Sequence, residues 1–157
     1  MVRAAEPEIF KEDLIELVVV VLPCVDEDVI RILEEETGKG AFPFILHCFS
    51  SGPELARRGV ELGGHVSFSG ILTFKNSQEI RDIAKTVPTD RLLVETDAPY
   101  LAPVPFRGKR NEPAFVAKTA AVLADTIGVT AEEIARITTE NFFRLFTKVP
   151  RELAREI

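Results

Sequence analysis

The chain is poor in cysteine, histidine and the larger aromatic residues: its 157 residues include two Cys, two His, one Tyr and no Trp. Cys24 and Cys48 stand far apart with no C-x-x-C pair, which argues against a disulfide scaffold and indicates a cytoplasmic protein with reduced thiols. The longest apolar run, 17–25, is too short to cross a bilayer, and acidic residues precede it, so we expect neither a membrane segment nor a secretory signal. Gly-rich nucleotide-binding motifs are also absent.

Charge and composition limit the class of protein further. The formal charge of −6 argues against broad electrostatic binding to nucleic acid. It still allows a local basic site, or an acidic pocket whose charge is reversed by a metal ion. With 46% hydrophobic and 28% charged residues, and no linker or repeat, the chain is expected to form a single domain over residues 1–157.

Predicted strands and helices alternate along the chain. Apolar runs predict strands at 17–22, 43–49, 65–72 and 92–95, and the third of them is expected to loosen into a loop at Gly70. The first run is valine-rich and indicates a central strand buried on both faces. Helical spacing, caps and breakers predict helices at 7–16, 27–37, 77–86, 112–127, 131–137 and 139–147, with another that begins near Pro53. Alternation of this kind predicts an α/β fold of parallel β/α units, a half TIM barrel with extra C-terminal helices.

The stretch 92–113 holds most of the residues with catalytic potential. Glu95 and Asp97 follow a short buried strand, and several prolines then disfavour a regular element. A basic cluster comes next, made of Arg107, Lys109 and Arg110. Acids at the end of a parallel strand, followed by a cationic loop, are how α/β enzymes build a site. The competing interpretation is an acid that only caps the next helix and a basic cluster that is only solvated surface.

A metal site is the second interpretation that the residue types favour. His47 lies near the C-terminal end of the second strand and Asp97 just past the fourth, so both are expected at the same end of the sheet. Imidazole and carboxylate together suit Zn²⁺, Mn²⁺ or Mg²⁺. The alternative is a hydrogen-bonded core histidine. His65 lies at the start of the third strand, at the end away from the expected site, and we interpret it as structural. Cys48 adjoins His47, but neighbours on a strand point to opposite faces, which disfavours a Cys–His nucleophile pair.

Five segments carry a family resemblance: HCFSSG (47–52), HVSFSGILTFKN (65–76), RLLVETDAPYLAP (91–103), RGKRNEP (107–113) and TTENFFRLF (138–146). Together they resemble the C-terminal half of the TatD-type metal-dependent deoxyribonucleases, over about residues 26–147. The resemblance implies an amidohydrolase-like TIM barrel and metal-dependent phosphodiester hydrolysis, typically on DNA ends.

The same resemblance assigns roles to individual residues. It implies that His47 and Asp97 bind the metal, and that Asp97 and Glu95 act in catalysis. It also implies a phosphate-facing, substrate-binding loop, formed by Arg107, Lys109, Arg110 and Asn111. The cofactor it implies is a divalent metal ion (Mg, Mn or Zn), and the substrate it implies is DNA, with RNA as the other option.

The chain also departs from the family pattern. The family begins with a strand bearing H-x-H, has a glutamate ligand on a middle strand and another histidine in a segment like VIHxRDADED, where this chain has Val21, Leu22 and Pro23. Of the expected ligands only His47 and Asp97 are present, and two ligands cannot fix two ions, so we expect very weak metal binding and little hydrolysis. A catalytically impaired fragment, or a remnant that binds phosphate or nucleic acid, is therefore the alternative. Open half-barrel edges also predict a homo-oligomer.

Overall fold

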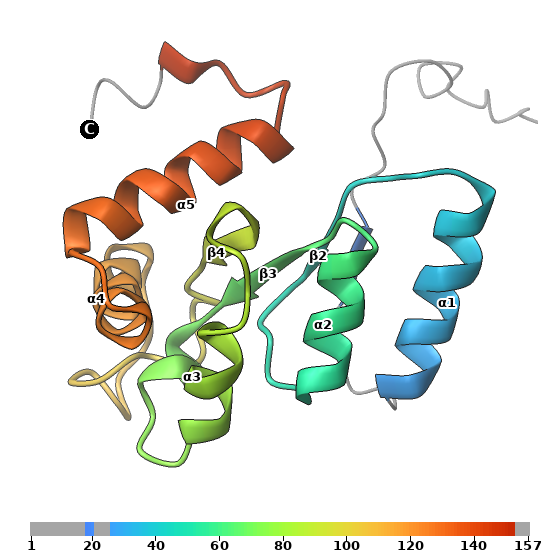
Figure 1. The fold of residues 1–157 in the computed structure, drawn as a ribbon. Helices are drawn as coiled ribbons and strands as arrows, with labels where there is room; N and C mark the ends of the chain where they lie inside the picture. Colours follow the sequence, from blue (N-terminus) through green and yellow to red (C-terminus); the bar gives the residue numbers. More distant parts are fainter. Residues whose placement is uncertain (1–17, 21–25, 153–157) are drawn as a thin grey trace, which may run out of the picture.

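The computed structural model describes residues 18–20 and 26–152, and these residues form a parallel sheet with helices packed around it (Figure 1). The sheet has four strands in the order β1-β2-β3-β4, which is also their order along the chain. They are β1 (Val18–Val20), β2 (Phe44–Leu46), β3 (His65–Phe68) and β4 (Leu92–Val94). Every neighbouring pair is parallel, so all the strands end at the same edge of the sheet. The predicted parallel β/α arrangement is confirmed.

Helices follow each strand. The α-helices are α1 (Asp26–Lys39), α2 (Pro53–Glu61), α3 (Gln78–Ala84), α4 (Val116–Ile127) and α5 (Ala131–Leu145). Short 3-10 helices are η2 (Gly70–Thr73), η3 (Thr89–Arg91) and η4 (Pro113–Phe115). In Figure 1, α1 and α2 lie side by side at one end of the sheet, and α4 and α5 group at the other end.

The side chains of the strands alternate between two faces of the sheet, and a different set of residues packs against each face. Phe44, Val66 and Leu92 belong to the main core, which also receives buried residues from all five α-helices. On the opposite face Ile45 and Leu93 pack with the end of α5 in a small second cluster. Because successive strand residues point to opposite faces, odd-numbered positions of β2, β3 and their extensions share this second face. The candidate site is built on that face.

The helix α2 and the turn that follows it pack closely against β2, because each has a glycine at the point of contact. A Cβ added at Gly59 would lie 2.7 Å from Cδ1 of Leu46, and one at Gly64 would lie 2.2 Å from the ring of Phe44. No side chain larger than hydrogen fits at either position without a shift of its neighbours. Close contact with this helix fixes β2, the strand that leads directly into His47.

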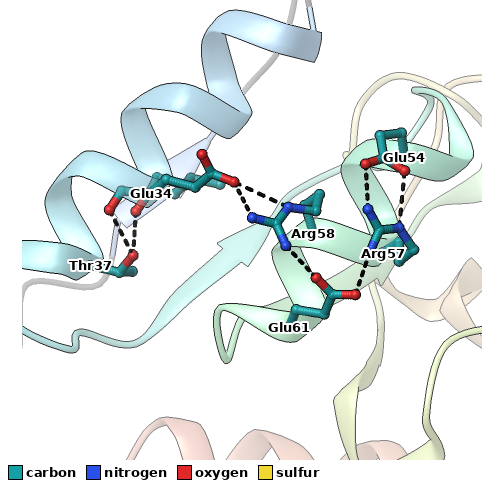
Figure 2. A network of polar contacts seen from close by, with 7 residues as sticks. Glu34, Thr37, Glu54, Arg57, Arg58 and Glu61 are labelled. Atoms are coloured by element: carbon teal, nitrogen blue, oxygen red, sulfur yellow. Dashed lines mark hydrogen bonds and ion pairs between the residues drawn. The ribbon is translucent and has the colours of Figure 1, made fainter.

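Arginines on α2 connect this helix to α1 (Figure 2). Arg58 forms ion pairs with Glu34 of α1 and with Glu61 of its own helix, and Arg57 pairs with Glu54 and Glu61. These groups are largely exposed, and exposed ion pairs contribute only about 0–1 kcal/mol each. The network therefore orients α1 and α2 relative to each other more than it stabilises the fold.

Some predicted boundaries are wrong. The first strand, predicted as central, is β1 at an edge of the described sheet, where β2 is its only partner among the described residues. The strand predicted at 43–49 ends at Leu46. The third strand ends at Phe68, and the chain has left strand geometry by Gly70, where η2 begins, as predicted. The helices predicted at 131–137 and 139–147 are the single helix α5: Thr138 bonds its hydroxyl to the carbonyl of Ile134 within the helix, which therefore continues. The helix predicted at 7–16 lies outside the described residues.

In the part of the chain that the structure describes, no single helix has both the length and the apolar character needed to cross a membrane. The pair Pro113–Ile127 and Ala131–Leu145, bent by 106°, meets the criterion jointly, by length and composition alone. The cytoplasmic location, the single-domain boundary and the homo-oligomer stay predictions.

Candidate metal centre

His47 is carried by the turn that follows β2. The strand ends at Leu46, and Cys48 has a φ of 49°, in the left-handed region that non-glycine residues seldom adopt. The next residue is again tied to the sheet, because the N–H of Phe49 donates to the carbonyl of Ser67 at 2.9 Å. The turn thereby holds His47 beside the end of β3.

The thiol of Cys48 lies next to a hydroxyl. Its Sγ is 3.2 Å from Oγ of Ser69. Strand alternation, by which the sequence predicts opposite faces for Cys48 and His47, does not separate them, because β2 ends before both residues. The side-chain contact observed for the thiol is to Ser69. Burial raises the pKa of the Cys48 thiol, the Ser69 hydroxyl opposes that shift, and the nearby carboxylates add to it, so the thiol is poorly suited to be a nucleophile.

Glu95 extends β4 by one residue and meets His47 across β3. Its N–H donates to the carbonyl of Phe68 at 3.0 Å. Its Oε2 accepts a hydrogen bond of 2.5 Å from the Ser67 hydroxyl and lies 3.1 Å from Nε2 of His47. The ends of three adjacent parallel strands thus supply one cluster of polar side chains.

Asp97 joins this cluster through an unusual backbone conformation. Its φ is 56°, and its carbonyl accepts a hydrogen bond from the N–H of Tyr100 at 2.9 Å, which closes a turn. His47, Glu95 and Asp97 each offer one donor atom, and these atoms all lie within 4.8 Å of one another. The non-glycine residues with positive φ in the described chain are Cys48, Asp97 and Leu101, all in the segments that frame this cluster. Such conformations cost roughly 1 kcal/mol or more and concentrate at functional sites.

The electrostatics of the cluster favour a cation. Burial raises the pKa of Glu95, and the charge of Asp97 adds to that shift. The Ser67 hydroxyl, the His47 imidazole and the backbone N–H of Cys48 act in the opposite direction. Two carboxylates in a half-buried setting repel each other, and a divalent ion between them would remove that repulsion.

The unpaired polar atoms of the cluster and the chemical types of its side chains also suit a metal ion. Nδ1 of His47 and Oε1 of Glu95 are buried and have no hydrogen-bond partner among the described residues. Buried polar atoms of this kind call for an unseen partner. One imidazole with two carboxylates gives the three protein ligands that a catalytic zinc site needs, and the same set suits Mn²⁺.

The predicted substrate loop lies next to the cluster, but its residues differ in their surroundings. Asn111 is only 3% exposed, and its side-chain amide donates to the carbonyls of Thr96 and Tyr100, both at 2.6 Å. Its own N–H donates to the carbonyl of Pro99 at 3.0 Å. The structure therefore places Asn111 inside the loop, where it fixes the loop's shape and leaves its amide no hydrogen for a phosphate.

The cations of the loop lie at its surface. The guanidinium of Arg107 stacks on the ring of Phe74, 3.6 Å from the centroid, which holds it in place. Lys109 and Arg110 are exposed, and the ammonium of Lys109 is 5.9 Å from the ring centroid of Phe106. The exposed cations Arg107, Lys109 and Arg110 are therefore available to an anionic ligand. Their contact with a substrate stays a prediction.

The loop is held in place by η2. A Cβ at Gly70 would lie 1.9 Å from the carbonyl oxygen of Leu101, so only glycine permits this approach. The N–H of Val104 donates to Oγ1 of Thr73 at 2.9 Å. These contacts position the basic residues relative to the ends of β3 and β4.

Sequence reasoning missed Ser67 and placed His65 correctly. Ser67 lies on the face of β3 where the cluster is built, the face it shares with His65. Strand alternation alone predicts this placement. His65 lies at the start of β3, is buried, and has no hydrogen-bond partner on either ring nitrogen among the described residues. Burial, with the charges of Arg91 and Arg144, lowers the pKa of His65 to about 4, which keeps the imidazole neutral.

Parallel β/α units whose strand ends gather an imidazole and two carboxylates form a candidate metal centre of the kind that metal-dependent hydrolases use. Comparison with known proteins makes the assignment specific: the profile of the family described as TatD related DNase matches residues 16–147. The chain belongs to the TatD family, which confirms the resemblance drawn from its motifs.

The chain is also similar to curated proteins that are named metal-dependent hydrolases. The chain is 53% identical over 121 residues to the uncharacterized metal-dependent hydrolase YcfH of Escherichia coli K12, covering 76% of this chain and 44% of the relative. It is 50% identical over 120 residues to the uncharacterized metal-dependent hydrolase YabD of Bacillus subtilis, covering 76% and 47%. The chain thus spans about half the length of the curated relatives it matches.

Solved structures agree with the fold. The crystal structure of YjjV, a TatD homolog from Escherichia coli K12, matches with a TM-score of 0.71 and 30% identity, over 80% of this chain and 47% of that one. A TatD family hydrolase from Entamoeba histolytica matches with a TM-score of 0.65 at 19% identity, over 76% and 47%, and supports the fold alone. The predicted fold class, parallel β/α units forming part of a barrel, is confirmed.

Proposed function

We propose that this chain is a metal-dependent phosphodiesterase that acts on DNA. The observation that supports this most is the cluster of His47, Glu95 and Asp97, whose donor atoms lie within 4.8 Å of one another at the ends of the strands. The sequence alone offered two ligands, while the cluster contains a third, Glu95, so we propose that one divalent ion binds here. Magnesium, manganese and zinc are the candidates.

Each residue of the cluster has a proposed task. His47, Glu95 and Asp97 would hold the ion, which when bound supplies Lewis-acid polarisation of a phosphate oxygen and lowers the pKa of water. Glu95 would act in catalysis as a ligand, because Ser67 and His47 engage its Oε2 and Oε1 has no partner among the described residues. Asp97 would keep the mouth of the cluster negative and take up a proton from the attacking water as a general base.

The cationic loop would bind the phosphates of the substrate. Lys109 and Arg110 are exposed, and Arg107 is held on Phe74, so three positive charges face solvent beside an otherwise acidic chain of net charge −6. A local basic patch on an acidic protein binds a polyanion at that patch and not over the whole surface. Asn111 would act indirectly, by holding the loop in its shape.

The deciding experiment is a nuclease assay on labelled single-stranded DNA with Mg²⁺, Mn²⁺ or Zn²⁺, with and without EDTA. We expect cleavage that EDTA abolishes and that Asp97→Asn lowers at least about 100-fold, because the variant loses a ligand and a proton acceptor. Asp125→Asn, which changes an exposed carboxylate on α4 outside the cluster, is the matched control and should cleave normally. Cleavage that survives in Asp97→Asn would belong to a contaminating nuclease and refute the proposal. An RNA of the same sequence, assayed in parallel, decides between the two nucleic acids.

A second candidate is a module that binds phosphate or nucleic acid without cleaving it. The exposure of Lys109 and Arg110 favours it, since these cations do not depend on a metal ion. DNA retention that falls with salt, in the absence of EDTA-sensitive cleavage, would select this candidate.

A further inference from the structure

We propose that Ser67 is a positioning residue, whose hydroxyl sets the orientation in which the Glu95 carboxylate joins the metal cluster. The inference rests on the proposed function, because it assigns Ser67 a role in that same site. Ser67 belongs neither to the predicted ligands nor to the predicted substrate loop. Its role would be to hold a ligand, not to touch metal or substrate.

The hydrogen bond between the two side chains is short, and its donor is a buried hydroxyl. Oγ of Ser67 donates to Oε2 of Glu95 at 2.5 Å, and Ser67 is only 3% exposed. Hydroxyl-to-carboxylate bonds of about 2.5–2.7 Å are charge-assisted and about twice as strong as neutral ones. The Ser67 hydroxyl orients the carboxylate together with the backbone N–H of Cys48 and the imidazole of His47, and it is the side-chain group among these three with the shortest contact.

The main chain on both sides of the bond is fixed. The carbonyl of Ser67 accepts from Phe49 at 2.9 Å, and the N–H of Glu95 donates to Phe68 at 3.0 Å. Ser67 lies in β3, between β2 and β4, at the level where Leu93 is its register partner. The hydroxyl therefore reaches Glu95 from a rigid platform, with one side-chain torsion left to adjust.

The consequence concerns which oxygen of Glu95 is free. Oε2 receives the Ser67 hydroxyl and also lies 3.1 Å from Nε2 of His47, while Oε1 is buried without a partner among the described residues. The serine thus anchors one oxygen and leaves the other for an incoming ion. Partners of metal-ligating carboxylates that orient them in this way typically change metal affinity by about 10–100-fold when removed.

Ser69 offers a matched comparison two residues further on. It is equally buried, at 1% exposed, but its hydroxyl pairs with the Cys48 thiol instead of a member of the cluster. Replacing either serine by alanine therefore removes one hydrogen bond made by a buried hydroxyl. Only the loss at Ser67 should disturb the ligand set.

The test measures Mn²⁺ binding by titration calorimetry in Ser67→Ala, Ser67→Cys, Ser67→Thr and Ser69→Ala. We expect about a ten-fold or larger loss of affinity in Ser67→Ala and in the nearly isosteric Ser67→Cys, and recovery in Ser67→Thr, which restores a hydroxyl. Ser69→Ala should stay within about two-fold of the parent chain. Equal Mn²⁺ affinity in the parent and Ser67→Ala, or an equal loss in Ser69→Ala, would overturn the role of Ser67.

A readout without metal separates this inference from the proposed function. Crystal structures of the metal-free parent and of Ser67→Cys should differ in the carboxylate of Glu95, which in the variant leaves hydrogen-bond distance of His47. If the parent binds no Mn²⁺ but the carboxylate moves as expected, the proposed function fails and the positioning role holds. An unmoved carboxylate refutes the positioning role whatever the metal does.

Discussion

The side-chain amide of Asn111 donates to the carbonyl of Thr96 across the base of the loop that carries Arg107, Lys109 and Arg110. Because the same amide also reaches the carbonyl of Tyr100, one buried side chain joins the two ends of the loop. We expect Asn111→Ala to destabilise the fold by about 1–3 kcal/mol, since it removes two hydrogen bonds made by a buried side chain. Urea unfolding followed by circular dichroism measures this change.

The control for Asn111 is Asn76→Ala, which removes an exposed amide from the turn before α3. It should shift the unfolding midpoint little, because surface substitutions usually change stability by less than about 0.5 kcal/mol. A midpoint for Asn111→Ala equal to that of the control would show that the loop does not depend on this side chain.

Gly70 is expected to be intolerant of any side chain. A Cβ there would lie 1.9 Å from the carbonyl oxygen of Leu101, a backbone atom that moves only with the loop. Gly70→Ala should therefore displace the loop, lower the melting temperature and weaken any binding that uses the loop cations. Gly38→Ala, within α1 and with nothing inside 4 Å of the new Cβ, should instead leave stability unchanged or raise it by about 0.5–1 kcal/mol. Similar melting temperatures for both variants would contradict the close approach.

The motifs of this sequence predicted the family and the strand-end location of the site, but not its contacts. Alternating apolar runs and caps are local signals, so the parallel sheet and the Thr130 cap of α5 followed from them. The hydrogen bond from Ser67 to Glu95 depends on the register between β3 and β4, and no local sequence pattern encodes that register. The burial of Asn111 likewise follows from the path of the loop, whereas the sequence shows only its basic neighbours.

The buried histidine predicts a pH dependence of stability. His65 has a pKa of about 4 in the fold, against about 6.5 in an unfolded chain, because burial and two nearby guanidinium groups disfavour its charged form. Between these values the unfolded chain binds more protons than the folded one, so stability is complete above pH 6.5 and falls as the pH drops toward 4. At about 1.4 kcal/mol per pKa unit, the loss amounts to at most about 3.5 kcal/mol.

Urea titrations at several pH values between 4 and 7 measure this loss. His65→Leu removes the titrating group and keeps an apolar side chain in the buried position, so its stability should change less steeply over the same range. Parallel slopes in the parent and in His65→Leu would show that another group is responsible.

The cations of the loop predict how DNA affinity depends on salt. Each phosphate contact made by Lys109 or Arg110 should contribute about 0.7 to the slope of log affinity against log salt for single-stranded DNA. Lys109→Ala and Arg110→Ala should each reduce that slope by about this amount, measured by fluorescence anisotropy with a labelled oligonucleotide in EDTA, which prevents cleavage. Arg136→Ala on α5 is the control, because its guanidinium pairs with Glu133 away from the loop. An unchanged slope in both loop variants, or the same drop in the control, would mean that DNA binds elsewhere on the protein.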